Sequence, residues 1–541
     1  MVEWQVTTPQ QSYDEFDTMT DKILKIRGIK DREAFLEPKE NDVNSPFALS
    51  NMQEAVDKII NAIDNKLNIG IYADIDFDGC TSATIMYKYL KNFGVNSVLL
   101  YHQRKDNHGV IINNVPKDIN LLIVVDSSTS SAKECSVLSK IMDIVILDHH
   151  QAERKNKYAT IVNPQLNDYS NKNLSGAGVV YQTCRAIDET LLTFYAGDYV
   201  DICAVGLIAD MMNVTDPETR YLIHKGLIKI QNKCDKNLLA ILKKVGKEYK
   251  PNATSIAFYL VPFINAIIRL GKIEDVLEIL TTDDDIRLKA LIKACGGKNE
   301  DRKVLQADIV EEIEKTIDLS HKMIIADVTS INVNKTLNGL IANAIAQKYQ
   351  KPTIVVSLDT DEDILKGSGR GYGSKFDFKK VLTDTGLFDS VAGHSGAFGV
   401  EILPNKIDDV YAIVDKILEN IEQDMKIEAD MVIEVEDISW DLAYEIQALS
   451  FIAGTGFKEP IFIIRGLSAE NVKVMKEVHL KFNAEDLECV KFNVSLEEIQ
   501  SVEDSLLIDI VGSISVNSWY NFGTKKTIRT KQVMLKDFII Y

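Results

Sequence analysis

Four short apolar runs, each ending where polar residues cluster, constrain the fold of this chain most strongly. The runs are residues 68–73, 97–101, 120–125 and 143–147, and stretches with helical periodicity separate them at 82–92 and 131–140. Continuous apolar runs of this length that alternate with helices are typical of a parallel sheet covered on both faces. We therefore predict a doubly wound α/β domain, in which ligand sites form beyond the carboxyl ends of the strands.

The rest of the chain predicts three further parts. Residues 176–300 are mostly helical, and residues 297–319 have the charge-rich pattern of a long exposed helix. A second α/β unit follows, with strands expected at 322–326 and 353–356, a helix at 339–349 and a flexible glycine-rich loop at 367–373. After about residue 425 strands dominate, which indicates a small closed β-barrel.

At 541 residues the chain exceeds what one hydrophobic core organises, so we divide it into five segments. These are an N-terminal segment (1–50), an α/β domain with a helical part (51–296), a connecting helix (297–319), a second α/β domain (320–425) and a β-barrel (426–541).

Composition limits the classes of function. The net charge of −19 argues against a protein coated in nucleic-acid-binding surface, because Lys and Arg make the phosphate contacts, so any nucleic-acid path must be local. The seven cysteines include no CxxC pair, which argues against a zinc cluster. We find no apolar run of 18 or more residues and no signal-peptide pattern after Met1. We therefore expect a cytoplasmic protein that does not bind a membrane.

The strongest functional signal is Asp74-Ile75-Asp76-Phe77-Asp78-Gly79, directly after the first apolar run. Alternate carboxylates at a strand end can converge on one hard cation, and Gly79 relieves the turn into the next helix. Alone, the pattern fits a calcium-type loop or a solvated turn as well as a catalytic metal. It is not alone, because later segments end in Asp126, Asp148, His149, His150 and Asp210.

These carboxylates and imidazoles can face one edge of the sheet. Several carboxylates around one site repel each other unless cations neutralise them, and this donor set suits Mn²⁺ or Mg²⁺. Two ions about 3.5–4 Å apart can share a carboxylate and activate a water against a phosphodiester. Adjacent His149 and His150 point in opposite directions if extended, so one can bind metal while the other contacts substrate. A helix cap or a hydrogen bond in the core is the alternative. We predict two divalent cations and hydrolytic phosphoryl transfer. The donor set leaves Mn²⁺ and Mg²⁺ open, and of the two we expect Mn²⁺.

At these residues the chain resembles the DHH phosphoesterase superfamily. The aspartates from Asp74 to Asp78, then Asp126, then Asp148-His149-His150, then Asp210 are similar to its motifs I to IV, in the same order. The flanking sequence resembles the RecJ nucleases at 35–38, 104–109, 175–178 and 206–210. The resemblance implies Asp74, Asp76, Asp78, Asp126, His149 and Asp210 as metal ligands. It also implies that Asp126 bridges the ions, that His150 contacts the scissile phosphate, and that Asp78, Asp126, His149 and His150 form the catalytic set.

Residues 366–370 and 392–397 resemble the DHH-associated domain, whose GGH motif faces the metals and binds substrate phosphate. This resemblance implies a phosphate site formed by Arg104, His150, Arg370, Gly393 and His394. Arg370 can pair with a phosphate bidentately, and glycine lets backbone N–H groups approach it. An ordinary glycine-rich loop is the alternative.

The C-terminal barrel resembles the oligonucleotide-binding (OB) fold of RecJ at 454–460, 479–481 and 517–519. Such barrels stack bases on aromatic side chains beside a basic groove. The residues that fit this role are Trp519, Tyr520, Phe522, Lys525, Lys526, Arg529 and Lys531. A hairpin with aromatic side chains in the core and lysines in solvent fits them equally well.

Several positions depart from the RecJ pattern. Ser127-Ser128 follow Asp126 where Cys-Gly is usual, Leu207 stands in place of Thr, and Ala392 is the first residue of the GGH motif. Residues 334–343 lack the usual Trp-His. These changes bear on substrate detail and rate, since the metal ligands are intact.

The resemblance implies an exonuclease that hydrolyses single-stranded DNA from its 5′ end in DNA repair, recombination or replication. We expect a monomer, with a single-strand-binding protein or a helicase as further partners. Two other hypotheses stay open. A DHH phosphodiesterase for short oligonucleotides or cyclic dinucleotides needs no barrel, and a non-catalytic single-strand-binding replication scaffold needs no metal ligands.

Overall fold

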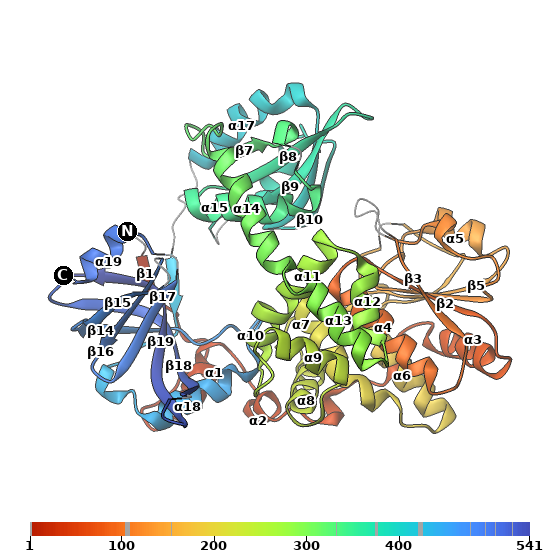
Figure 1. The fold of residues 1–541 in the computed structure, drawn as a ribbon, viewed down its shortest axis with the longest axis horizontal. Coiled ribbons are helices and arrows are strands. Elements are labelled where there is room, and N and C mark those ends of the chain that lie inside the picture. Colours follow the sequence, from red (N-terminus) through yellow and green to blue (C-terminus); the bar gives the residue numbers. More distant parts are fainter. Residues whose placement is uncertain are drawn as a thin grey trace. The chain divides into compact units, whose positions relative to one another are not determined.

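The computed structural model of the chain describes residues 3–102, 109–152, 154–331, 333–373, 377–419, 426–475, 478–492, 494–503, 505–521 and 523–541. Arg104, His108 and Phe522 lie outside the described residues, as do the side chains of Tyr520 and His394. The chain forms two compact units: unit 1 is Met1–Glu3 with Gly297–Ile427, and unit 2 is Trp4–Gly296 with Glu428–Tyr541. Both are mixed α/β (Figure 1). The division into five segments stays a prediction.

A five-stranded parallel sheet organises the first part of unit 2, as predicted. Its strands are β2 (Ile69–Ala73), β3 (Ser97–Leu100), β4 (Leu121–Val125), β5 (Asp143–Leu147) and β6 (Thr160–Val162), in the order β3-β2-β4-β5-β6. After β2 the chain forms β3 on one side of β2, and it then returns to form β4 on the other side, followed outward by β5. The strand order therefore reverses between β2 and β4, and ligand sites form beyond the carboxyl ends of strands at such a point.

Helices cover both faces of this sheet. Ile69 and Ile71 belong to the larger core, with α3 (Met52–Asp64), α4 (Phe77–Lys91) and α6 (Gly176–Leu191). Tyr72 and Leu122 belong to a second core with α5 (Ala132–Leu138). Successive strand residues alternate between the two cores, which explains why the strands are apolar throughout. The doubly wound prediction is confirmed.

The predicted helical region is also confirmed. After α6 it comprises α7 (Val200–Ala209), α8 (Pro217–Lys233), α9 (Lys236–Lys244), α10 (Ala253–Ser255), the π-helical turn η5 (Ile256–Leu260), α11 (Val261–Leu270), α12 (Ile273–Thr281) and α13 (Asp285–Cys295). Gly206 lets α7 approach α4 and α6, because a Cβ at this position would lie 2.5 Å from both Ala177 Cβ and Asp78 Oδ1. This close packing places α7 against the first turn of α4.

One helical stretch, Ala253–Leu270, is long and apolar enough to cross a membrane, with a mean hydropathy of 1.6 over 18 residues. The expectation that no such stretch exists was wrong for this segment. Ile256, Leu260 and Ile264 of the stretch lie in the main core of unit 2. The helices of a protein core pass the same test of length and composition, so this feature is weak evidence for a membrane.

A seven-stranded sheet forms the C-terminal part of unit 2, so the strand-dominated prediction is confirmed. Its order is β13 (Met431–Val432), β14 (Phe462–Leu467), β18 (Ile508–Asn521), β19 (Lys526–Ile540), β17 (Leu487–Phe492), β16 (His479–Ala484) and β15 (Glu470–Met475). The helices α18 (Trp440–Leu449) and α19 (Leu496–Glu503) accompany it. Within the described residues, β13 and β15 are its edge strands.

The N-terminal helices, α1 (Met19–Ile26) and α2 (Arg32–Leu36), contact this C-terminal part. Arg27 donates hydrogen bonds to both carboxylate oxygens of Asp430 at 2.7 Å. Its guanidinium carbon lies 4.5 Å from the ring centroid of Phe457, and the Phe35 ring lies 4.7 Å from the same ring. A bidentate ion pair combined with ring contacts is a strong tie between segments far apart in the sequence.

Unit 1 contains a five-stranded sheet in the order β10 (Ser390–His394), β11 (Ala397–Ile402), β9 (Ile364–Arg370), β8 (Thr353–Asp359) and β7 (Ile324–Asp327). Its α-helices within the described residues are α14 (Lys298–Glu314), α15 (Asn338–Tyr349), α16 (Phe378–Asp384) and α17 (Ile407–Glu419). A separate two-stranded sheet, β1 (Glu3–Val6) with β12 (Lys426–Ala429), has residues in each unit. The predicted flexible loop at 367–373 is wrong, because residues up to Arg370 form strand β9. A Cβ at Gly367 would collide with the Val355 carbonyl, and one at Gly369 with the Phe398 ring. The glycines there serve close packing.

Gly206→Ala should destabilise unit 2. The added methyl group must displace Ala177 or the Asp78 carboxylate, and overpacking of this kind costs about 1–3 kcal/mol. Thermal unfolding in chelator should show a lower melting temperature. Gly197→Ala is the matched control, because nothing lies within 4 Å of a Cβ there. Equal melting temperatures for the two variants would contradict the packing argument.

Candidate functional site

Polar side chains gather at the carboxyl edge of the parallel sheet of unit 2. Asp74 and Asp76 follow β2, Asp126 follows β4, and the segment Asp148–His150 follows β5. These three strands are neighbours and run parallel, so their carboxyl ends meet at one edge. Asp210, the C-cap of α7, reaches the same place.

Three sets of potential metal-binding atoms occur among the described residues, each with its atoms within 4.8 Å of one another. The sets are Asp78, His149 and Asp210; Asp74, Asp76 and Asp126; and Asp126, His149 and His150. The first two sets share no residue, while the third joins them through Asp126 and His149. This arrangement offers two adjacent positions for cations.

His149 and Asp126 lie where these sets meet. His149 Nε2 is 3.2 Å from Asp126 Oδ1 and 3.3 Å from Asp210 Oδ2. Asp126 is 1% exposed and has a φ of 63°, a left-handed conformation that aspartate tolerates better than most side chains. A conformation of this kind at a strand end turns the carboxylate toward its neighbours at the expense of local backbone energy.

Burial and mutual repulsion dominate the electrostatics of the carboxylates. Asp76 is exposed at the rim, but loss of solvent to the surrounding protein atoms, followed by the charges of Asp74 and Asp78, raises its pKa to about 6. Burial and the charge of Asp78 raise the pKa of Asp210 to about 8, and the pKa of Asp126 is raised well above its ordinary value for the same reasons.

The donor set fits divalent cations. Asp78 Oδ2 and both carboxylate oxygens of Asp126 are buried and accept no hydrogen bond from the described residues. Buried carboxylates without donors are costly unless they are protonated or coordinate a cation. Carboxylate oxygen with imidazole nitrogen suits Mn²⁺ and Mg²⁺, so the residues present match the predicted cofactor.

Asp148 has a different environment from the other carboxylates. Its Oδ1 accepts hydrogen bonds from His150 Nδ1 at 2.8 Å and from the backbone N–H of His149 at 2.7 Å, and its Oδ2 accepts one from Thr129 N–H at 3.0 Å. Burial opposes its ionisation, but the hydrogen bond and charge of His150 outweigh burial and lower the pKa of Asp148 to about 2. The same hydrogen bond raises the pKa of His150 to about 9. Asp148 therefore orients His150 and keeps it protonated.

The two histidine rings are neighbours, with centroids 4.4 Å apart. The expectation that they point in opposite directions was made for an extended segment, so it does not apply here. The peptide there is not an extended strand. Their environments still differ, because His149 Nε2 faces Asp126 and Asp210 while His150 Nδ1 is taken by Asp148.

Known proteins are similar to this chain over most of its length. Residues 68–207 match the N-terminal domain of the DHH family, and residues 429–532 match the RecJ OB domain. The chain is 30% identical to the putative SPbeta prophage-derived single-strand DNA-specific exonuclease YorK of Bacillus subtilis, over 94% of this chain and 96% of that protein. The chain belongs to the RecJ-like DHH family.

More distant relatives agree with this assignment. The single-stranded-DNA-specific exonuclease RecJ of Bacillus subtilis is 26% identical over 99% of this chain and 70% of its own length. The crystal structure of RecJ in complex with Mn²⁺ from Thermus thermophilus has a TM-score of 0.78 at 21% identity, over 96% of this chain and 76% of that one. At this identity the structural match shows the shared fold.

Three residues at the start of α6 contact the candidate metal site, and sequence reasoning gave them no role in it. Ser175, the N-cap of α6, donates a hydrogen bond from Oγ to Asp78 Oδ1 at 2.9 Å, and Ala177 N–H donates one at 3.3 Å. A Cβ at Gly176 would lie 2.5 Å from Asp126 Oδ1. The N-terminus of α6 therefore contacts both carboxylates. The signal in the sequence was the Ser-Gly-Ala-Gly segment at 175–178. The family resemblance pointed to this segment but assigned no function to it.

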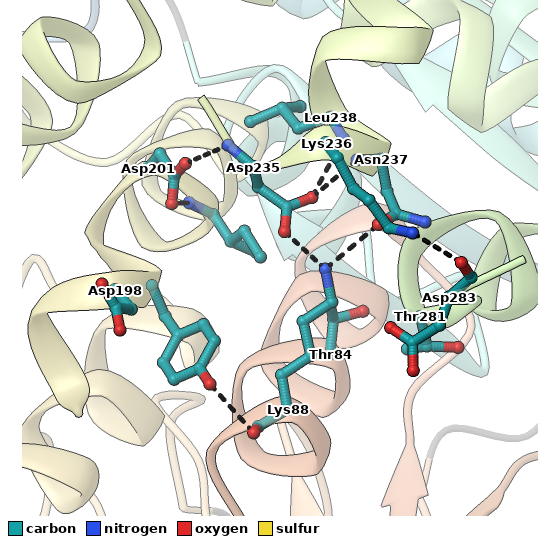
Figure 2. A network of polar contacts seen from close by, with 12 residues as sticks. Thr84, Lys88, Asp198, Asp201, Asp235, Lys236, Asn237, Leu238, Thr281 and Asp283 are labelled. Carbon is teal, nitrogen blue, oxygen red and sulfur yellow. Dashed lines mark hydrogen bonds and ion pairs between the residues drawn. The ribbon is translucent and has the colours of Figure 1, made fainter. Parts of the chain in front are cut away.

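A polar network fixes α4 and α7 at the ends far from the metal site (Figure 2). Lys88 of α4 pairs with Asp235 at 2.6 Å, just before α9. Asp201, in the first turn of α7, is fully buried, accepts a hydrogen bond from Asp235 N–H at 2.8 Å and pairs with Lys229 of α8 at 2.8 Å. The network holds the helices that carry Asp78 and Asp210 in a fixed relation.

Three of the predicted phosphate-binding residues, Arg370, Gly393 and His394, lie in unit 1. The strands β9 and β10 both pair with β11, and the register places Arg370 and His394 opposite Ala397 from its two sides. Gly393 has a φ of 129°, which explains the glycine. Arg370 is partly buried against Gly339, and burial lowers its pKa.

The predicted nucleic-acid-binding residues of the C-terminal sheet lie on the β18–β19 hairpin. Trp519 is 39% exposed and pairs in register with Ile528, while Lys526 pairs with Asn521 at the hairpin end. Lys525 and Arg529 belong to the same exposed or half-buried hairpin arm. Lys531 is different: it is 6% exposed, pairs with Asp486 at 2.7 Å and donates a hydrogen bond to the Ile438 carbonyl. The expectation that Lys531 lies in a solvated basic groove was wrong.

Without metal, the protein should lose stability as pH rises from about 5 to 8. The folded-state pKa values of Asp76 and Asp210, about 6 and about 8, exceed the ordinary value of 3.8. The folded state therefore binds more protons than the unfolded state in this range, and the free energy of unfolding falls with rising pH. Melting temperatures in chelator should decline across this range, and added Mn²⁺ should raise them more at pH 8 than at pH 6. A metal-free melting temperature that rises with pH would contradict the assignment.

Asp148→Asn should lower the pKa of His150 from about 9 toward the ordinary value near 6.5, because the asparagine keeps the shape and removes the charge. Titration of the imidazole resonances by NMR in chelator measures this shift, and a His150→Gln variant assigns the signal. Thr129→Ala is the matched control, because its backbone N–H still bonds Asp148. An unchanged His150 titration in Asp148→Asn would show that Asp148 does not govern the protonation of His150.

Proposed function

We propose that this chain is a metal-dependent exonuclease that hydrolyses single-stranded DNA from its 5′ end and releases nucleotides. The observation that carries the proposal is the pair of adjacent cation positions, lined by buried carboxylates and His149, at the point where the strand order of the sheet reverses. Single-stranded DNA as the substrate is supported by the relatives, which are named as exonucleases specific for single-stranded DNA. The polarity rests on family resemblance.

We assign Asp74, Asp76, Asp78, Asp126, His149 and Asp210 as the residues that would hold two ions, Mn²⁺ or Mg²⁺. Asp126 belongs to two of the three sets of donor atoms, so it would be the shared ligand. Bound cations supply a water of lowered pKa and stabilise charge on the phosphate oxygens. His150, held protonated by Asp148, donates a hydrogen bond to an oxygen of the scissile phosphate. Ser175 and the N-terminus of α6 hold the Asp78 carboxylate in place.

We assign the substrate contacts from the side-chain types and from the family resemblance. Arg104, Arg370, Gly393 and His394 bind phosphate groups near the cleaved end, and Trp519, Lys525, Lys526 and Arg529 bind the strand at the hairpin of the OB domain. We further propose a cytoplasmic monomer that acts in DNA repair, recombination or replication, together with a single-strand-binding protein or a helicase.

Two observations disfavour the other hypotheses. The OB domain at residues 429–532 gives an extended binding surface that a dinucleotide does not need. A scaffold that had lost catalysis would not keep six metal-binding side chains in place around buried, uncompensated carboxylates.

The proposal is tested with single strands labelled at either the 5′ or the 3′ end, incubated with Mn²⁺ or with chelator. We expect the 5′ label to appear in nucleotides at once and the 3′ label only after the strand has been shortened. Asp126→Asn should reduce the rate at least about 100-fold, because it removes a charge that the cations need. Chelator should abolish cleavage.

Duplex DNA and a dinucleotide serve as controls for specificity. Strands cut at full rate in chelator, or by Asp126→Asn, would exclude the assigned metal site. A dinucleotide turned over faster than a long strand would favour the phosphodiesterase hypothesis. Strands that are bound equally well with chelator and never cut would favour the scaffold.

A further inference from the structure

A lysine–aromatic surface lies on unit 2 outside the metal site, between the end of α9 and the start of α11. It consists of Lys243, Lys244, Lys247, Tyr249, Lys250, Phe258 and Tyr259. Tyr249 is 82% exposed, Phe258 72% and Tyr259 47%. Singly exposed aromatic side chains are ordinary, but exposed aromatic side chains that gather beside lysines are typical of a binding surface.

The lysines of this surface are free of acidic partners. None of the four forms an ion pair with a carboxylate in the part of the chain that the structure describes. Some lysines of this acidic protein, such as Lys88 and Lys229, are instead paired with an aspartate. Lys243 and Lys244 end α9, where the helix dipole favours cations, but Lys247 and Lys250 lie beyond the helix. Their charge is available to an anionic ligand.

The π-helical turn η5 presents the aromatic pair. The Val261 N–H bonds to the Ile256 carbonyl five residues earlier, and Pro262, which follows, has no N–H to continue an α-helical pattern. The inserted residue widens the turn, a feature found frequently at functional sites. Lys247 Nζ lies 3.9 Å from the Tyr259 ring centroid, so the loop after α9 contacts the π-helical turn.

The surface adjoins both parts of unit 2 that the proposed function uses. The turn η5 packs against α7, the helix that ends at Asp210. The preceding α10 contacts the OB domain, where Thr254 Oγ1 donates a hydrogen bond to Glu459 Oε1 at 2.8 Å. A chain of contacts therefore links this surface to the metal-site helix on one side and to the OB domain on the other.

We propose that the lysine–aromatic surface binds single-stranded nucleic acid, with bases stacked on Tyr249 and Phe258 and phosphates against Lys247 and Lys250. The inference rests on the proposed function and extends it, since it assigns a binding surface outside the metal site and the OB domain. Aromatic faces accept any base, and unpaired lysines match a polyanion in an otherwise acidic protein. An anionic membrane surface would use similar residues, and the experiment separates the two.

The test compares two variants of the full chain, Tyr249→Ala/Phe258→Ala and Lys247→Gln/Lys250→Gln. Binding of a fluorescent oligothymidylate is measured by anisotropy in chelator at several salt concentrations. We expect the aromatic variant to bind about tenfold more weakly with an unchanged salt slope. The lysine variant should have a salt slope shallower by up to about 1.4, because two phosphate contacts are lost.

Matched controls are Phe16→Ala, an aromatic side chain that is 88% exposed, and Lys133→Gln/Lys140→Gln, both exposed lysines. These should bind as the unmodified protein does. Melting temperatures verify that all variants fold, which is expected because every substituted side chain except the half-buried Lys247 is exposed.

The outcomes distinguish this inference from the proposed function. If the two test variants bind the oligonucleotide as tightly as the controls, the inference is overturned, whatever the activity. If they instead lose affinity for vesicles of anionic phospholipid and keep their affinity for DNA, the surface binds membranes and the inference is again overturned. If the unmodified protein cuts no strand with Mn²⁺, the proposed function fails, while weaker oligonucleotide binding by the variants still supports this surface.

Discussion

Repulsion among buried carboxylates is the constraint on which the rest of unit 2 depends. The aspartates that follow β2 and β4, and Asp210 at the end of α7, lie within a few ångströms of one another with few hydrogen-bond donors between them. Such a group is unfavourable in a folded protein unless protons or cations neutralise it. The surrounding framework must therefore hold these side chains together against their own charge, and a rigid sheet edge clamped by several helices meets that requirement.

The framework does this through short-range packing and a few well-placed dipoles. Gly206 lets α7 approach α4, and the N-terminus of α6 directs Ser175 Oγ and backbone N–H groups at Asp78. The positive end of a helix dipole lowers the local cost of negative charge. The protonated His150 imidazole adds a positive charge at the rim of the site. Asp148 stabilises this charge, and both oxygens of its carboxylate accept hydrogen bonds. The contacts that pack the helices together therefore also place hydrogen-bond donors and positive charge beside the carboxylates.

The sequence predicted this region well because its signals are local. Apolar runs end at the residues that carry the chemistry, so the position of Asp74, Asp126 or His149 in the fold follows from strand order alone. Prediction failed where an outcome depended on distant neighbours. The glycines at 367 and 369 looked like a loop, but they lie in a strand crowded by Val355 and Phe398. Lys531 looked like a solvated base, but Asp486, 45 positions earlier in the chain, and the Ile438 carbonyl fix it in place. The direction of the His149 and His150 rings likewise depends on Asp126, Asp210 and Asp148 together.

Unit 2 is discontinuous in sequence, since residues 297–427 of unit 1 are inserted between its two segments. During synthesis the ribosome therefore completes the parallel sheet and its helices long before residue 430 emerges. Until then Arg27 has no Asp430 to pair with, and Phe35 has no Phe457 to pack against. The nascent N-terminal helices therefore lack these two contacts until an entire second unit has been translated, although Arg220 can already pack on the Phe35 ring.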